Sequence, residues 1–122
     1  MAIAIKRVYD APEASDGVRV LVDRLWPRGV SKERAELDEW LKDAAPSPEL
    51  RTEWHHADAD RFDEFAARYR AELDGNPAAQ ALLALAGERE RVTLLYGARD
   101  AVRNHAAVLR DWLGEHGAAV ER

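Results

Sequence analysis

The chain has 122 residues, 47% hydrophobic and 34% charged, which is typical of one folded domain and not of a disordered segment. Its net charge of −5 argues against a general nucleic-acid-binding protein. The absence of cysteine excludes disulfides, thiolate nucleophiles and cysteine metal ligands, and fits a reducing compartment. The N-terminal apolar run is too short for a signal peptide, and no segment has the ~20 apolar residues of a membrane helix. We therefore expect a soluble, cytoplasmic, single domain over residues 1–122.

The first part of the chain predicts two strands joined by the turn-rich run 10–17. Ile3, Ile5 and Val8, together with Lys6 and Arg7, predict the first strand. The Asp-Gly pair at 16–17 is a turn signal, and a second strand is expected over 18–23. A loop that carries two arginines follows this strand, and Ser31 is the expected N-cap of a helix after the loop.

Helices and one further strand fill the rest of the chain. The predicted helices lie over 35–41, from the cap Ser47 and first-turn Pro48 through 54, from Asp58 or Asp60 through 73, from Pro77 to Gly87, and over 102–113. A continuous apolar run over 91–96 predicts a strand buried on both faces. This alternation predicts a small three-layer α/β domain with a mainly parallel central sheet flanked by helices.

The loop after the second predicted strand is the first candidate binding element. Arg24 and Arg28 leave the end of a buried strand, and a guanidinium binds phosphate or carboxylate through paired hydrogen bonds. The indole of Trp26 could stack on a ring or on a guanidinium, although such a side chain is also a common packing residue. In the alternative, the two arginines only fasten the loop, by pairing with Asp23, Asp38 or Asp100 or with the C-terminus of a helix. Both interpretations remain open at this point.

The second candidate element follows the predicted strand 91–96. The carboxyl ends of parallel strands meet at one edge, so this segment is expected to converge with the arginine loop. Its expected substrate-binding residues are Arg99 and Asn104, and Tyr96 would supply a hydroxyl. His105 would transfer a proton, because its ordinary pKa lies near neutrality. Asp100 would orient His105 or cap the helix, and His105 itself could instead be a structural side chain.

The run from 55 to 60 superficially resembles a metal site. It places His56 and Asp60 four residues apart, with Asp58 between them. The run is expected to join two helices, however, and aspartates at such positions commonly cap helices. We therefore predict no bound metal, and no motif in the chain indicates an organic cofactor.

A set of motifs extends over nearly the whole chain. They are Arg7-Val-Tyr-Asp10, Arg19-Val-Leu-Val-Asp-Arg-Leu-Trp-Pro-Arg-Gly-Val-Ser31, Ala45-Pro-Ser47, Leu50-Arg51, Arg68-Tyr69 with Glu72-Leu73, Leu94-Leu-Tyr96 and Asn104-His-Ala106. Together they resemble the domain-of-unknown-function 488 family, in its YeaO-like branch. The resemblance implies a compact bacterial α/β domain with no assigned activity.

Two positions bear on what this resemblance implies. Other branches of the family carry cysteines near the equivalent of the Tyr96 loop, and this chain has none, so thiol chemistry is not carried over. His55 stands where the YeaO-like pattern usually has an aromatic residue. His56 matches the pattern and joins the expected substrate-binding residues.

Two functions are expected from these features. The first is a small enzyme or ligand-binding domain for a phosphate-containing or other anionic small molecule, which Arg24, Arg28 and Arg99 would hold. The second is a non-enzymatic interaction module that binds a protein or nucleic-acid partner through the Arg/Trp loop, since both residue types are favoured at interfaces. The residues leave open whether the chain catalyses a reaction.

Overall fold

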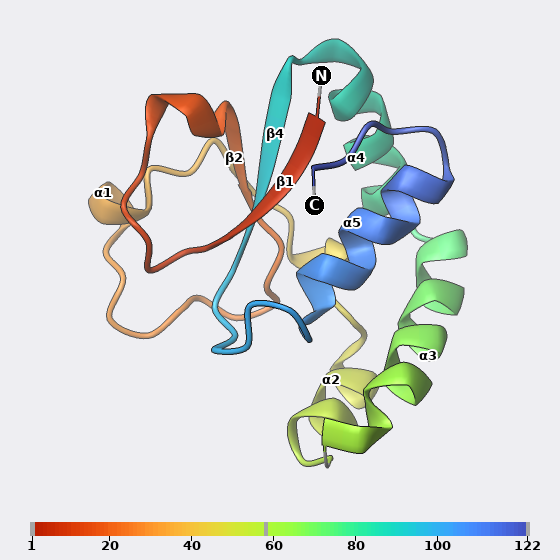
Figure 1. Ribbon diagram of the computed structural model, residues 1–122. Coiled ribbons are helices and arrows are strands. Elements are labelled where there is room, and N and C mark those ends of the chain that lie inside the picture. The colour runs from red at the N-terminus through yellow and green to blue at the C-terminus, as the bar shows by residue number, and fades with distance from the viewer. Residues whose placement is uncertain (1, 58, 122) are drawn as a thin grey trace.

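A computed structural model describes residues 2–57 and 59–121, and it shows a four-stranded sheet in the order β1-β4-β2-β3 (Figure 1). The strands are β1 (Ala2–Arg7), β2 (Val18–Leu21), β3 (Glu39–Trp40) and β4 (Arg91–Tyr96). All three strand pairings are parallel, so all four carboxyl ends lie at the same edge of the sheet. The chain is thus a small α/β domain with a parallel sheet, as the sequence predicts.

Helices lie on both faces of this sheet, but one face is covered by more helices than the other. They are α1 (Lys32–Ala35), α2 (Pro48–His55), α3 (Phe62–Asp74), α4 (Pro77–Glu88) and α5 (His105–Glu115), and three short 3-10 helices cover Ala14–Asp16, Lys42–Ala44 and Ala59–Arg61. Helices α3 to α5 cover one face, and α1 lies beyond the other (Figure 1). Within the described ranges, no helix has both the length and the apolar composition needed to cross a membrane.

Two hydrophobic cores follow from this arrangement. On the face covered by the long helices, Leu94 of β4 packs in a cluster with Tyr69 and Trp112. On the opposite face, Leu95 packs with Leu21, Ala35 and other residues, and Trp26 and Trp40 cover this smaller cluster. Alternate residues of β4 therefore enter different cores, which confirms the predicted burial of this strand on both faces.

Two predicted helices differ from those observed. The segment 35–41 is not helical, because α1 ends at Ala35 and Glu36 adopts a left-handed conformation with φ of 46°. The chain then pairs with β2, and Leu41 N donates to Leu21 O at 2.9 Å. The helix expected over 102–113 begins only at His105, which leaves 97–104 as a longer loop.

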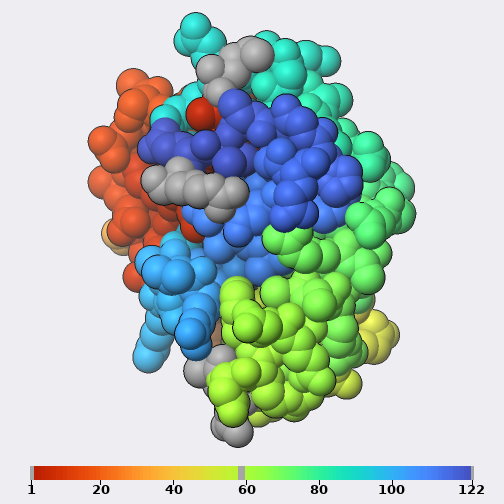
Figure 2. Space-filling view, turned by 45° about the vertical axis from the view of Figure 1, so that its right-hand side comes forward, coloured from red at the N-terminus to blue at the C-terminus, as the bar shows by residue number. Residues whose placement is uncertain are grey.

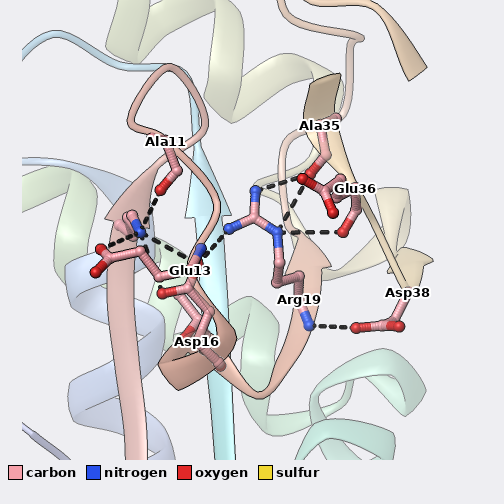
Figure 3. A network of polar contacts seen from close by, with 9 residues as sticks. Ala11, Glu13, Asp16, Arg19, Ala35, Glu36 and Asp38 are labelled. Carbon is pink, nitrogen blue, oxygen red and sulfur yellow. Dashed lines mark hydrogen bonds and ion pairs between the residues drawn. The ribbon is translucent and has the colours of Figure 1, made fainter. Parts of the chain in front are cut away.

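A buried ion network at the amino end of the sheet holds α1 in place (Figure 3). Arg19 is 4% exposed, and its Nη1 atom lies 2.5 Å from Oδ2 of Asp16. On its other side it donates to the carbonyl oxygens of Ala35 and Glu36, at the end of α1. Burial alone would raise the pKa of Asp16, but the Glu13 backbone N–H, together with the Lys6 and Arg19 side chains, brings it below its ordinary value.

Candidate functional site

The two loops expected to form a site lie against each other at the carboxyl edge, and Asp23 joins them. Gly97 N, just after β4, donates to Asp23 Oδ2 at 2.9 Å. A Cβ atom at Gly97 would lie 2.9 Å from that oxygen and 3.8 Å from Cβ of Pro27. The absence of a side chain at position 97 therefore permits the close approach of the two loops.

His105, the first residue of α5, also contacts the end of β2. Its Nε2 atom lies 3.0 Å from Val22 O and 3.1 Å from Asp23 Oδ1. A carbonyl oxygen only accepts hydrogen bonds, so we assign a proton to Nε2, and in the neutral ring Nδ1 is then the basic nitrogen. In the described part of the chain, the buried Oδ1 atom makes no hydrogen bond, so its contact with His105 is electrostatic.

Asp23 is therefore the carboxylate beside His105, in the position predicted from the sequence for Asp100. Asp100 Oδ1 accepts hydrogen bonds from Val102 N and Arg103 N, and these bonds bring the pKa of Asp100 below its ordinary value. Asn104 donates to Asp100 O and accepts from the backbone of α5, as its N-cap. Both side chains thus fix the turn that leads into α5.

The arginines of the candidate site have different environments. Arg24 Nε donates to Pro46 O at 3.2 Å, and its Nη1 atom lies 3.7 Å from Asp43 Oδ1. Arg28 and Arg99 are exposed, and neither guanidinium has a hydrogen bond or ion pair within residues 2–57 and 59–121. Arg24 therefore connects its loop to the 43–46 segment, whereas Arg28 and Arg99 are available to a ligand. Arg24 thus fastens its loop, as the structural alternative expects, but through Pro46 and Asp43 and not through the expected aspartates.

The other candidate residues lie in packed or peripheral positions. Trp26 donates from its indole nitrogen to Val30 O at 2.6 Å, and its ring meets Trp40 edge-on at 5.2 Å. Tyr96 is 2% exposed, and burial raises the pKa of its phenol. His56 is exposed at the C-cap of α2, with the ring of His55 beside it. Trp26 thus makes packing contacts, the alternative considered above, and its binding of a substrate stays a prediction.

A group of polar residues around the 43–47 segment was not predicted from the sequence. Ser47 donates to Glu72 from both its backbone nitrogen (2.9 Å) and its hydroxyl (2.6 Å). Tyr69 donates to Ala44 O, and its ring lies 6.2 Å from that of His105. Burial raises the pKa of Tyr69 well above its ordinary value, and the charges of Glu72 and Asp23 raise it further. Helical spacing indicates only that Tyr69 faces the core, so it carries no signal for these contacts.

The described residues form a concave surface at the opposite edge of the sheet and another beside the 97–104 loop. One lies at the amino ends of β2 and β4 and includes Gly17, Arg89 and Arg91. Another includes Ile5 and Val102. Within the described residues, no three His, Asp or Glu side chains come together as metal ligands would. Asp58, part of the run considered above as a metal site, lies outside those residues.

Asp23→Ala is expected to lower the free energy of unfolding by about 2 kcal/mol, because the Gly97 N–H loses its acceptor and the two loops lose their connection. Urea denaturation would measure the loss. Asp43→Ala is the matched control, since the Asp43 side chain is 88% exposed and contacts Arg24 only at 3.7 Å. Equal losses in the two variants would show that Asp23 does not join the loops.

Comparisons with known proteins identify the family. A family model described as "Inactive DUF488-N3 subclade" matches residues 2–121. The uncharacterized protein YeaO of Escherichia coli (strain K12) is 48% identical over 113 residues, which cover 93% of this chain and 97% of YeaO. The uncharacterized protein Rv3073c of Mycobacterium tuberculosis (strain ATCC 25618 / H37Rv) is 47% identical over 111 residues, covering 91% and 92% of the two chains. No solved structure matches the chain. The chain belongs to the DUF488 family, in the subclade that this model describes.

Proposed function

We propose that this chain is a binding domain for a small anionic molecule, such as a phosphate-containing one, which it holds at the carboxyl edge of its sheet. The observation that carries the proposal is that the two joined loops present Arg28 and Arg99 without partners among the described residues. Guanidinium groups suit phosphate and carboxylate oxygens. In open α/β sheets, ligands commonly bind beyond the carboxyl ends of the strands.

Binding without catalysis is the better supported form of this proposal. The description of the matching family model includes the word inactive. Asp100 and Asn104 are engaged in the turn before α5, and the neutral, buried form of Tyr96 is favoured. In this proposal, Asp23 and His105 hold the two loops in position. Catalysis by His105, Asp100 and Tyr96 remains a prediction, and a cytoplasmic location rests on the cysteine-free composition.

Calorimetric titration with inorganic phosphate and with a nucleoside monophosphate tests the proposal. We expect the wild-type chain to bind one or both, and the Arg28→Ala/Arg99→Ala double variant to bind at least about tenfold more weakly. The double variant should fold normally, because neither guanidinium makes a hydrogen bond or ion pair with another of the described residues. Arg89→Ala is the control, since Arg89 is exposed and precedes the opposite end of β4.

Two results would contradict the proposal. One is the absence of binding to either ligand by the folded wild-type chain. The other is an equal loss of affinity in Arg89→Ala and in the double variant. That result would show either that the anion binds elsewhere or that the loss of affinity reflects only the change in net charge.

A further inference from the structure

One outer strand of the sheet, β1, has an edge that faces away from the other strands. The strand order places β4 on one side of β1 only. Ala2 N and Val8 N donate to carbonyl oxygens at the two ends of β4. Backbone groups of successive residues point to opposite sides of a strand, so the even-numbered residues of β1 face β4. The N–H and C=O groups of Ile3, Ile5 and Arg7 therefore point away from the sheet.

The C-terminal segment pairs with the first of these three residues. Ile3 N donates to Ala119 O at 2.8 Å, and Glu121 N donates to Ile3 O at 2.8 Å. These bonds form a parallel bridge between Ile3 and Val120. Figure 1 shows the C-terminal segment, in dark blue, beside the amino half of β1. Extended backbone is therefore what this edge already binds within the chain.

The pairing stops after Ile3. The next bond of such a ladder would run from Ile5 N to Glu121 O, and it is not formed. In the part of the chain that the structure describes, Ile5 N, Ile5 O and Arg7 N have no hydrogen-bond partner at this edge, whereas Arg7 O accepts from Asp10 N at 3.1 Å. A row of unpaired backbone groups at the edge of a sheet is a template for another strand.

A hollow of about 330 Å³ lies beside this unpaired part of β1. Its lining residues come from β1, the loop before α5, α5 and the C-terminal segment, and they are Ala4, Ile5, Ala101, Val102, Arg110 and Glu121. Figure 2 shows the light-blue 97–104 segment and the dark-blue C-terminal segment on one face of the molecule. Ile5 is partly buried and Val102 is 76% exposed. A strand added to β1 would therefore have apolar side chains beside it.

The charged side chains of the hollow have partners inside the chain. Glu121 Oε2 lies 2.5 Å from Arg91 Nη1. Arg110 Nε lies 3.2 Å from Asp111 Oδ1, and the Arg110 side chain is largely buried. A ligand carboxylate or ammonium group would have to compete with these ion pairs. Aliphatic side chains would instead gain by leaving water for the apolar part of the hollow.

We propose that the open edge of β1 binds an extended, uncharged segment of a protein partner, which adds a strand beside Ile5 and Arg7 and places an aliphatic side chain in the hollow. Main-chain hydrogen bonds to Ile5 and Arg7 would hold the segment, and contacts with Ile5 and Val102 would select its side chains. This binding does not depend on the anion binding proposed above.

Two other occupants fit this edge less well. A helix uses its own backbone groups internally, so it would leave those of Ile5 unpaired. A second copy of the chain could pair only through Ile5 and Arg7, because Ile3 is already paired. Antiparallel pairing of these residues would place the two Lys6 side chains opposite each other, and like charges directly opposite are destabilising.

Selection from a random peptide library displayed on phage, with the full chain as target, tests the inference. We expect enriched peptides that carry Val, Ile or Leu at alternate positions. In synthetic copies of these peptides, N-methylation of the amides that face β1 should weaken binding at least about tenfold, because each loses a hydrogen bond and gains a clash. N-methylation of the amides in between should have little effect. Calorimetry would measure both series.

A variant of the hollow and a matched control locate the peptide. Val102→Asp should weaken binding about tenfold, because it places a carboxylate in the apolar part of the hollow. Leu25→Asp is the control, since Leu25 is also an exposed aliphatic residue, at 56%, and does not line the hollow. Circular dichroism would establish that both variants are folded. In the wild-type chain, bound peptide should slow hydrogen exchange at the amides of Ile5 and Arg7.

Four outcomes would overturn the inference. The first is the absence of enriched peptides, and the second is an equal loss of affinity in Val102→Asp and Leu25→Asp. The third is an equal effect of N-methylation on both sets of peptide amides. The fourth is a dimer in light scattering in which the amide of Ile5 is protected without peptide, since a second copy would then occupy the edge. Phosphate binding through Arg28 and Arg99 is a separate measurement that none of these results changes.

Discussion

Replacing Arg19 by methionine is expected to lower the free energy of unfolding by about 3 kcal/mol or more, because the substitution breaks a buried ion pair and leaves its partners unsatisfied. Asp16, 5% exposed, would lose its closest cation, although its ion pair with Lys6 would remain. The carbonyl oxygens of Ala35 and Glu36 would lose their donors at the end of α1. Urea denaturation followed by tryptophan fluorescence would measure the loss.

A control substitution at an exposed arginine of α1 separates the effect of the buried network on stability from the effect of net charge. Arg34 is exposed, and we expect Arg34→Met to change the stability little. A similar loss in both variants would show that net charge, and not the buried network, accounts for the effect.

Gly17→Ala is expected to cost about 3 kcal/mol, for two reasons that act together. Gly17 has φ of 65° and ψ of −133°, a combination that residues with a side chain rarely adopt. A Cβ atom there would lie 2.3 Å from Arg91 O, at the start of β4. The clash is with backbone, so β2 and β4 would have to separate at their amino ends. Thermal denaturation would report the loss as a lower melting temperature.

Gly87→Ala is a comparison variant in which we expect the stability to change in the opposite direction. Gly87 lies within α4, and no atom approaches the position of its Cβ within 4 Å. Alanine has the higher helix propensity, so we expect a gain of up to about 1 kcal/mol. A gain or no change in Gly17→Ala would contradict the backbone conformation described for the turn before β2.

Most elements of the fold were predicted correctly from the sequence, and these are the elements whose local sequence signals agree with their tertiary packing. The apolar run of β4 is buried on both faces, and Ser47 with Pro48 begins α2 as expected. The prediction over 35–41 was wrong because Leu37, Trp40 and Leu41 fit either helical spacing or a short edge strand. Pairing of this segment with β2 decides the outcome, and that pairing is a tertiary interaction.

The approach of the two loops was predicted from the sequence, but the contacts between them were not. The rule that parallel strands share a carboxyl edge predicted the approach of the two loops. The role of Asp23 depends on a contact with Gly97, 74 residues away in the chain, for which the sequence has no local signal. His105 lies at this edge as expected, with a different carboxylate beside it. The exposure of Leu25 and Val102 likewise follows from loop geometry that periodicity does not describe.

The central claim is that an anion binds at the carboxyl edge of the sheet, between the two joined loops. Locating the bound anion on the folded chain tests this claim most directly. Titration of the isotopically labelled protein with inorganic phosphate, followed by the amide resonances, would locate the bound ion. The proposal predicts shifts concentrated in residues 24–29 and 97–104, the two loops joined by Asp23. Shifts concentrated at Gly17 and Arg89 to Arg91, on the concave surface at the opposite end of the sheet, would contradict it. An unchanged spectrum at saturating phosphate would contradict it equally.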